Sequence, residues 1–250
     1  MRSRTSSVVF AFLVIAATTA SAGTINFADN FSPPSTEWSN STGSWTATGG
    51  DYYAQVPNNN PYAETTLPFD LTSYTLTVTV NALGDSGIFV RTNATDTQWV
   101  LLVLGGNGYG AGFRGGNAGS SLYWADSNNT SDQGLVTGVF TPGNAYTITV
   151  TAVGDTFSAY INGSSTPVSA FTDAVGGSDG EVGLYDNQPD TARGGSGTPT
   201  TYSNFSLQGT TVSSVPEPGI ALLMLGGLAV LMVGRRAWRC STKADREPVR

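Results

Sequence analysis

The sequence contains no histidine, and its single cysteine, Cys240, lies close to the C-terminus. An intrachain disulfide is therefore excluded, as are Ser-His-Asp and Cys-His catalysis and zinc sites built from histidine or several thiolates. Any reaction that this chain catalyses has to use carboxylates, tyrosines or a bound cation.

Charged residues are scarce as well, at 12% of the chain, and basic ones are rarest in its middle. Between Gly23 and Ser214 the basic residues are Arg91, Arg114 and Arg193, against 15 acidic residues, so this part has a net charge near −12. Such a surface repels phosphate backbones, and we expect no nucleic-acid partner. Solubility outside the cell explains the acidity, and cation binding is the alternative.

Between the two ends, no helical period of useful length occurs, and the apolar residues form short runs between turns that are rich in glycine, serine and asparagine. Residues 74–80 alternate strictly, with Tyr74, Leu76, Val78 and Val80 on one face and threonines on the other, as in a half-buried strand. Residues 98–104 are almost continuously apolar, which is typical of a central strand. The firmest prediction is a hairpin of residues 146–153 and 156–161, joined by Gly154-Asp155. Further strands are expected at residues 87–91, 121–125, 181–185 and 202–207.

The N-terminus has the form of a secretory signal peptide. Arg2 and Arg4 precede an apolar run from Val8 to Ala17, and Ala20-Ser21-Ala22 is a small-x-small cleavage site. The apolar run is far shorter than the ~20 residues that span a bilayer, which argues against a membrane anchor. We predict a signal peptide over residues 1–22, cleaved after Ala22 by signal peptidase.

The C-terminus combines three features in a fixed order. The motif Pro216-Glu217-Pro218-Gly219 is followed by an apolar run over residues 220–234 and then by Arg235 and Arg236. The prolines separate the preceding domain from the following segment, and the arginines favour the cytoplasmic side. We predict a linker over residues 210–219, a transmembrane helix over 220–234 and a basic cytoplasmic tail over 235–250.

This arrangement resembles the PEP-CTERM sorting signal, which an exosortase of Gram-negative bacteria recognises. The resemblance implies export across the inner membrane, retention in that membrane, processing near the Pro-Glu-Pro motif, and delivery to the cell surface or extracellular matrix. An ordinary C-terminal membrane anchor is the alternative.

The intervening domain, residues 23–209, carries spaced aromatic residues and glycines. Phe31, Trp38 and Trp45 near its start, and Phe205 near its end, are expected to fill an inter-sheet core. The pattern resembles concanavalin A-like and laminin-G-like domains, which implies an all-β fold, an antiparallel β-sandwich of the jelly-roll type. Members of that superfamily commonly bind glycans, and some hydrolyse them.

A glycoside hydrolase requires two carboxyl groups on either side of the scissile bond, ~5 to 10 Å apart. The glucanases of this superfamily carry a Glu-x-Asp-x-x-Glu strand, which is absent here. The glutamates of the domain, Glu37, Glu64 and Glu181, are isolated in the sequence. We therefore predict a non-catalytic carbohydrate-binding module, with a structural matrix or biofilm protein as the first alternative and a glycoside hydrolase as the second.

Aromatic side chains that stack on sugar rings are the candidate binding residues. Tyr109, Phe113 and Arg114 lie in a glycine-rich stretch, and Tyr123 and Trp124 follow it. Such residues serve equally well as core.

Calcium is the candidate cofactor, because superfamily members often tie their first and last strands with this ion. Asp29, Asp186 and Asn204 are the matching positions, and each has turn capping as its alternative role.

Overall fold

The computed structural model describes residues 22–56, 62–81, 83–95, 97–106, 120–128, 133–141, 143–173, 179–187 and 200–211. The expected signal peptide, the Pro-Glu-Pro motif, the transmembrane segment and the basic tail lie outside these ranges. The described ranges contain no helix that is long and apolar enough to cross a membrane. Residues 22–212 form one compact unit, and its apolar core is enclosed by its own strands, so we expect this unit to fold alone.

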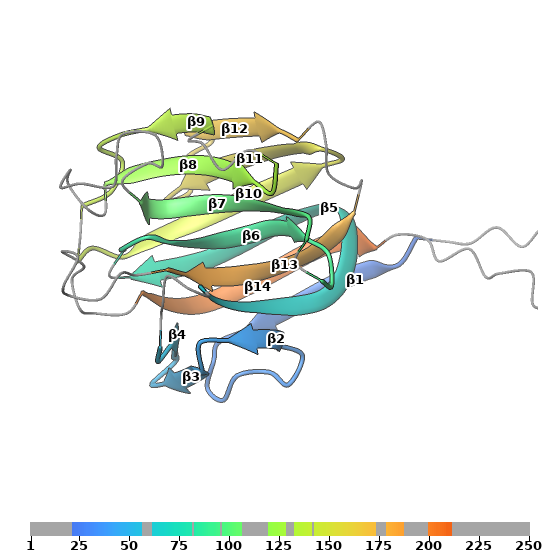
Figure 1. The fold of residues 1–250 in the computed structure, drawn as a ribbon, viewed down its shortest axis with the longest axis vertical. Helices are drawn as coiled ribbons and strands as arrows, with labels where there is room; N and C mark the ends of the chain where they lie inside the picture. The colour runs from blue at the N-terminus through green and yellow to red at the C-terminus, as the bar shows by residue number, and fades with distance from the viewer. Residues whose placement is uncertain are drawn as a thin grey trace, which may run out of the picture. The chain divides into compact units, whose positions relative to one another are not determined.

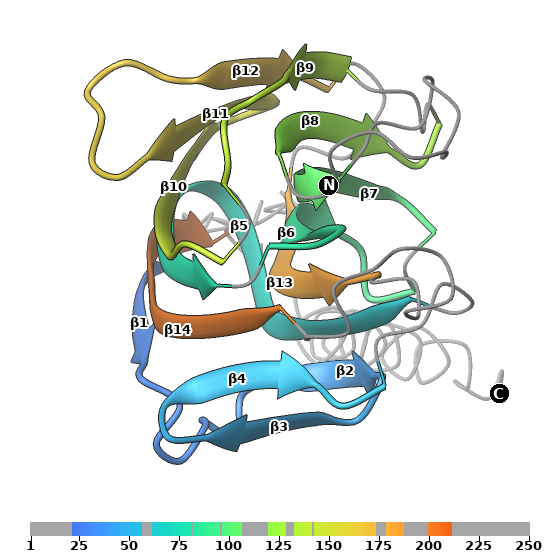
Figure 2. The same cartoon turned by 90° about the vertical axis from the view of Figure 1, so that its left-hand side faces the viewer.

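Fourteen strands make up the described chain and build two packed layers (Figures 1 and 2). The first sheet has the order β2-β5-β13-β6-β7-β8-β9, and the second has the order β12-β11-β10-β5-β14-β1. The strands of the first sheet, apart from β5, are β2 (Ser39–Thr42), β6 (Ser86–Thr92), β7 (Trp99–Gly106), β8 (Ser121–Asp126), β9 (Gln133–Val136) and β13 (Gly180–Asp186). Those of the second are β1 (Thr24–Asp29), β10 (Tyr146–Val153), β11 (Thr156–Ile161), β12 (Ser169–Thr172) and β14 (Thr201–Thr211).

Strand β5 (Ala63–Asn81) belongs to both sheets. Its first half pairs with β13, from Ala63 opposite Asp186 to Leu71 opposite Gly180. Its second half pairs with β10 on one side and β14 on the other. The strand therefore passes from the first sheet to the second (Figure 2), and the change occurs near Leu71, which pairs with both β13 and β14.

The predicted strands are confirmed where the structure describes them. In the hairpin of β10 and β11, Val153 lies opposite Thr156 and Ile148 opposite Ile161. Along β5, Tyr74, Leu76, Val78 and Val80 are buried, as their alternation requires. The fold class, an antiparallel all-β sandwich, follows from this pairing.

The main core lies between the two sheets. It is filled by the inward side chains of both layers, among them Ile88, Leu102 and Trp124 from the first sheet and Val78 and Val150 from the second. At ~25 cal/mol per Å² of buried apolar surface, this interlayer contact is the main favourable contribution to folding.

An aromatic cluster extends this core beneath a short hairpin, β3 (Trp45–Thr48) and β4 (Asp51–Ala54), which joins the second sheet through β14. Phe31 and Phe205 are 1% exposed, and Trp38 packs against both, while Trp45 packs against Tyr52 and Tyr202. The expected core role is confirmed for Phe31 and Phe205, whereas Trp38 and Trp45 are partly buried and pack against the core from its margin.

Candidate functional site on the outer face of the first sheet

The face of the first sheet that points away from the interlayer core has an unusual composition. In an antiparallel sandwich an outward face is commonly polar, because it meets water. Here a second apolar cluster occupies it, built from Phe89 on β6, Leu101 and Val103 on β7, Tyr123 on β8 and Tyr185 on β13. Tyr62 and Trp99 pack against this cluster and are partly exposed.

The aromatic rings on this outer face form a connected row. Tyr62 lies 5.3 Å from Tyr185, which lies 5.7 Å from Phe89, and Phe89 lies 6.2 Å from Trp99, measured between ring centroids. The two partly exposed rings stand at its two ends. They are the aromatic side chains of this cluster that a ligand can reach, and aromatic rings of this kind stack on sugar faces.

An acid–amide pair, Asp85 and Asn187, lies at one edge of the same face. The two residues continue the antiparallel ladder of β6 and β13, since the Asn187 backbone N–H donates to the Asp85 carbonyl at 2.9 Å. The side-chain amide of Asn187 also donates to Asp85 Oδ2 at 3.1 Å. The pair continues the ladder one position beyond Ser86 and Asp186, so by alternation we expect both side chains to lie on the same face as that of Tyr185.

Two properties distinguish this pair from an ordinary turn. Burial raises the pKa of the Asp85 carboxyl to about 7, although the hydrogen bond from Asn187 acts in the opposite direction. Asn187 is 4% exposed, and its Oδ1 receives no hydrogen bond from any described residue. Perturbed carboxyls and buried acceptors without a donor are both concentrated at functional sites.

Two glutamates lie further along the same face. Glu64 on β5 is opposite Tyr185, and Glu181 lies near the start of β13. The hydroxyl of Thr66 donates to Glu181 Oε2 at 2.8 Å, and Thr66 is two residues from Glu64 on the same strand. The glutamates that looked isolated in the sequence therefore share one sheet face on neighbouring strands.

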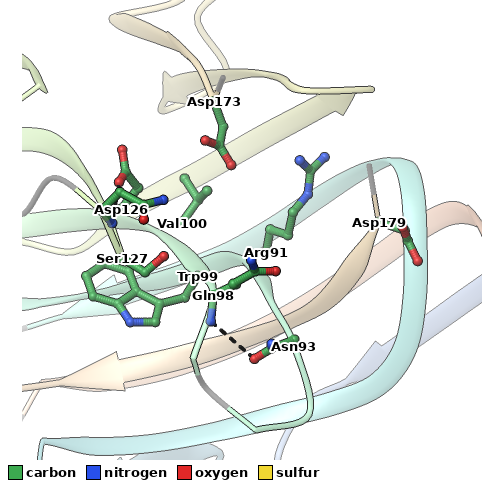
Figure 3. Close-up of a pocket in the computed structure, with 10 residues that line it drawn as sticks. Arg91, Asn93, Gln98, Trp99, Val100, Asp126, Ser127, Asp173 and Asp179 are labelled. Atoms are coloured by element: carbon green, nitrogen blue, oxygen red, sulfur yellow. Dashed lines mark hydrogen bonds between the residues drawn. The ribbon is translucent and has the colours of Figure 1, made fainter. Parts of the chain in front are cut away.

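A small polar pocket of about 40 Å³ lies at the opposite end of the sandwich from the acid–amide pair (Figure 3). Arg91 on β6 and Asp173 after β12 border it, together with Asp126, and Trp99 lies beside Ser127 at one side. Arg91 donates to Asp155 Oδ1 at 3.0 Å and to the Gly154 carbonyl at 2.6 Å, outside the pocket lining. A pocket of this volume holds a few water molecules and is too small for a sugar ring.

The prediction that Tyr123 and Trp124 are exposed and can stack on a sugar is wrong. Tyr123 is 1% exposed within the outer cluster, and Trp124 is 0% exposed in the interlayer core, where its indole N–H donates to Ser169 Oγ at 2.9 Å. Consecutive residues of a strand face opposite ways, and both faces of β8 are covered, which explains the burial of both. Tyr109, Phe113 and Arg114 lie outside the described residues.

The structure does not bring together the three residues expected to bind calcium. Asp29 ends β1 opposite Phe205 in the second sheet, whereas Asp186 ends β13 in the first, and packed sheets are about 10 Å apart. Asp29 and Asn204 do line one shallow hollow. The carboxylate of Asp29 caps the following loop instead, accepting from the backbone N–H groups of Phe31 and Ser35, each at 2.7 Å, and from Trp38 Nε1 at 2.8 Å. No group of three or more acidic, cysteine or histidine ligands occurs among the described residues.

Sequence reasoning missed Tyr62, Asp85, Trp99 and Asn187. A signal for Trp99 was present, because residues 99–104 place Val100, Leu102 and Leu104 on one face and Trp99, Leu101 and Val103 on the other, so one of two apolar faces had to lie outward. No local signal pairs Asp85 with Asn187, since 102 residues separate them.

Comparison with known proteins finds no matching family and no matching curated protein. Solved structures do match. The basic winged bean lectin with Tn-antigen aligns at a TM-score of 0.51 and 9% identity, over 75% of this chain and 98% of that one. Lectin II from Ulex europaeus aligns at a TM-score of 0.51 and 11% identity, over 76% of this chain and 98% of that one. The carbohydrate-binding module CBM66 from Bacillus subtilis aligns at a TM-score of 0.43 and 14% identity, over 70% of this chain and 92% of that one. The chain thus has the β-sandwich fold found in lectins.

Proposed function

We propose that this protein is an exported surface or matrix protein that binds carbohydrate without cleaving it, on the outer face of the first sheet. The acid–amide pair carries the proposal. Asn187 Oδ1 is a buried acceptor without a donor among the described residues and lies on the side chain that bonds the Asp85 carboxyl, so a sugar hydroxyl that entered beside this pair would supply the missing hydrogen bond.

The surrounding face supports this assignment. Tyr62 and Trp99 offer partly exposed rings at the two ends of the aromatic row. A sugar presents an apolar ring face and a hydroxyl-bearing edge, so one ring for stacking and the acid–amide pair for its hydroxyls are complementary to it.

The glycoside hydrolase alternative rests on Glu64 and Glu181. Their placement on adjacent strands, with Thr66 donating to Glu181, puts two carboxyl groups on the proposed binding face. Release of reducing ends from a bound polysaccharide, lost in both E64Q and E181Q, would establish the enzyme. Binding without release in the wild type supports the non-catalytic module.

A structural matrix protein is the remaining alternative. It predicts self-association or retention in the matrix that survives changes to the outer face. Sedimentation of the wild type, D85N and W99A without added polysaccharide separates the two, because a matrix protein of this kind self-associates in all three, whereas a binding module does not.

We further propose that residues 1–22 direct export and that Pro216 to Gly219, with Arg235 and Arg236, direct membrane retention and sorting by an exosortase. Support comes from the order and spacing of these features in the sequence. The double variant with Glu217→Ala and Pro218→Ala is expected to be exported and to remain unsorted. Normal surface delivery of this variant would contradict the sorting proposal.

The binding experiment uses the unit from Ala22 to Val212 and a panel of soluble neutral polysaccharides, among them dextran, laminarin and hydroxyethylcellulose. Saturable binding in the wild type and its loss in N187A are expected. D70N is the control, since Asp70 is exposed on β5 where the strand crosses between the sheets.

A further inference from the structure

Two buried tyrosines cross the interlayer core from the second sheet and end on the backbone of β6. Tyr74 comes from β5 and its hydroxyl donates to the Val90 carbonyl at 2.5 Å. Tyr202 comes from β14 and reaches Gly87, three residues earlier on the same strand. Both are at most 6% exposed, and burial raises the pKa of each phenol far above its ordinary value.

The hydroxyl of Tyr202 occupies a junction of two strands. It accepts from the Gly87 N–H at 3.1 Å, and it lies 2.5 Å from the Tyr185 carbonyl and 3.0 Å from the Gly87 carbonyl. A phenol has one proton to donate, and it donates this proton to the nearer acceptor, the Tyr185 carbonyl. Gly87 and Tyr185 are partners in the register of β6 and β13, so one side chain holds both strands at a single rung.

That rung is the neighbour of the acid–amide pair. Asp85 lies two residues before Gly87, and Asn187 lies two residues after Tyr185, so the pair occupies the next outward-facing position of the same ladder. Gly87 adds to the constraint, because a Cβ at this position would lie 2.3 Å from the Leu102 carbonyl oxygen. The strand is therefore fixed from its two sides, by Tyr202 and by β7.

We infer that Tyr202 is a positioning residue for the acid–amide pair, which it holds in its hydrogen-bonded geometry by tying Gly87 to Tyr185. It acts from the far sheet and touches neither member of the pair in any contact given above. The Tyr202 ring also packs in the aromatic cluster of the second sheet, where the ring centroid of Trp45 lies 6.0 Å away. Packing in that cluster therefore affects the binding face through Tyr202. The inference rests on the proposed site, but its first test does not depend on a ligand.

Tyr74 provides a matched control. Y202F and Y74F each remove one buried hydroxyl from a tyrosine that spans the core to β6, and each leaves the ring in place. Both variants are expected to lose stability. Only Y202F acts at the rung next to Asp85, because the Tyr74 hydroxyl ends at Val90, toward the other end of the strand.

The test is the titration of the Asp85 carboxyl, followed by carbon NMR in wild type, Y202F and Y74F of the unit from Ala22 to Val212. D85N identifies the signal. In the wild type the pKa is about 7. In Y202F the strand ends loosen and water reaches the carboxyl, so its pKa falls toward the ordinary value, whereas Y74F keeps the wild-type value. An unchanged pKa in Y202F, or an equal fall in Y74F, would overturn the positioning role.

If the Y202F variant does not fold, a second measurement on the wild type tests the same inference. Exchange of the wild-type Gly87 amide proton is expected to be as slow as that of the central strands, since the Tyr202 hydroxyl accepts it in the core. Fast exchange of this amide would overturn the inference. Binding of laminarin is then compared between Y202F and Y74F. If the pKa falls in Y202F and neither variant nor the wild type binds any polysaccharide of the panel, the positioning role stands and the proposed function fails.

Discussion

The most informative single change is Asp85→Asn, because it separates binding from stability. The carboxyl of Asp85 has a pKa of about 7, against an ordinary value of 3.8, and burial is the main cause. A sugar hydroxyl that donates to this group favours its ionised form. Binding is therefore expected to follow the ionised fraction of Asp85.

The expected magnitude follows from that pKa. About nine-tenths of the carboxyl is ionised at pH 8 and about one hundredth at pH 5, so the apparent Kd should rise by about 100-fold between these values. The bound polysaccharide of the panel is titrated calorimetrically at pH 5, 6, 7 and 8. D85N should bind weakly and without pH dependence, and D70N should follow the wild type. A wild-type Kd that is constant across this range would refute the reasoning.

Stability should change in the opposite direction. A carboxyl whose pKa is raised in the folded state gives the fold a contribution that is fully present below about pH 4 and is lost as the pH rises through 7. The loss is at most about 4 kcal/mol at 1.36 kcal/mol per pH unit, and less because Asp85 is partly exposed. At pH 8, D85N should therefore unfold at a higher urea concentration than the wild type, and near pH 4 the two should be equal. Lower stability of D85N at pH 8 would contradict this account.

Three further changes test how the fold holds the site. Asp29→Ala removes the acceptor of two backbone N–H groups and of the Trp38 indole, and should cost about 2 to 4 kcal/mol in urea unfolding; an unchanged midpoint would contradict the capping role. Arg91→Met breaks the ion pair with Asp155 and the contact 4.8 Å above the Phe157 ring, and should cost about 2 to 3 kcal/mol, more than Asp155→Asn, because the Asp155 side chain is 49% exposed. A lower urea midpoint for Asp155→Asn than for Arg91→Met would contradict this expectation. Gly87→Ala places a Cβ against the Leu102 carbonyl and should lower the melting temperature by more than any of these; a melting temperature equal to that of the wild type would show that β6 and β7 are not held at this spacing.

Much of the fold could be predicted from periodicity. Alternation along residues 74–80 places the correct four side chains in the core, and Gly154-Asp155 ends the hairpin at the observed register. The length of β5 could not be predicted, because Pro68 interrupts the apolar pattern at the point where the strand leaves one sheet for the other. The outward direction of Trp99 was not predicted, and the inward direction of Trp124 was misjudged, for a related reason. Both tryptophans lie in strands that are apolar on both faces, and such a sequence does not indicate which face packs against the other sheet.

The site was harder to predict than the fold. Asp85 and Asn187 meet across two strands that are adjacent in the sheet and 102 residues apart in the chain. Thr66 and Glu181 meet in the same way, although 115 residues separate them in the chain. Such pairs depend on the register of β13 between β5 and β6, and this register includes shifts that no local pattern encodes.

The central claim is that the outer face of the first sheet binds carbohydrate, and calorimetric titration of the unit from Ala22 to Val212 with the neutral polysaccharide panel tests it most directly. Each titration is run with calcium and with a chelator, which also tests the expected cofactor. The account predicts saturable binding in the wild type, loss of at least about tenfold in affinity in N187A and in W99A, and no release of reducing ends. No binding to any member of the panel under either condition, or binding that N187A and W99A leave unchanged, would contradict it.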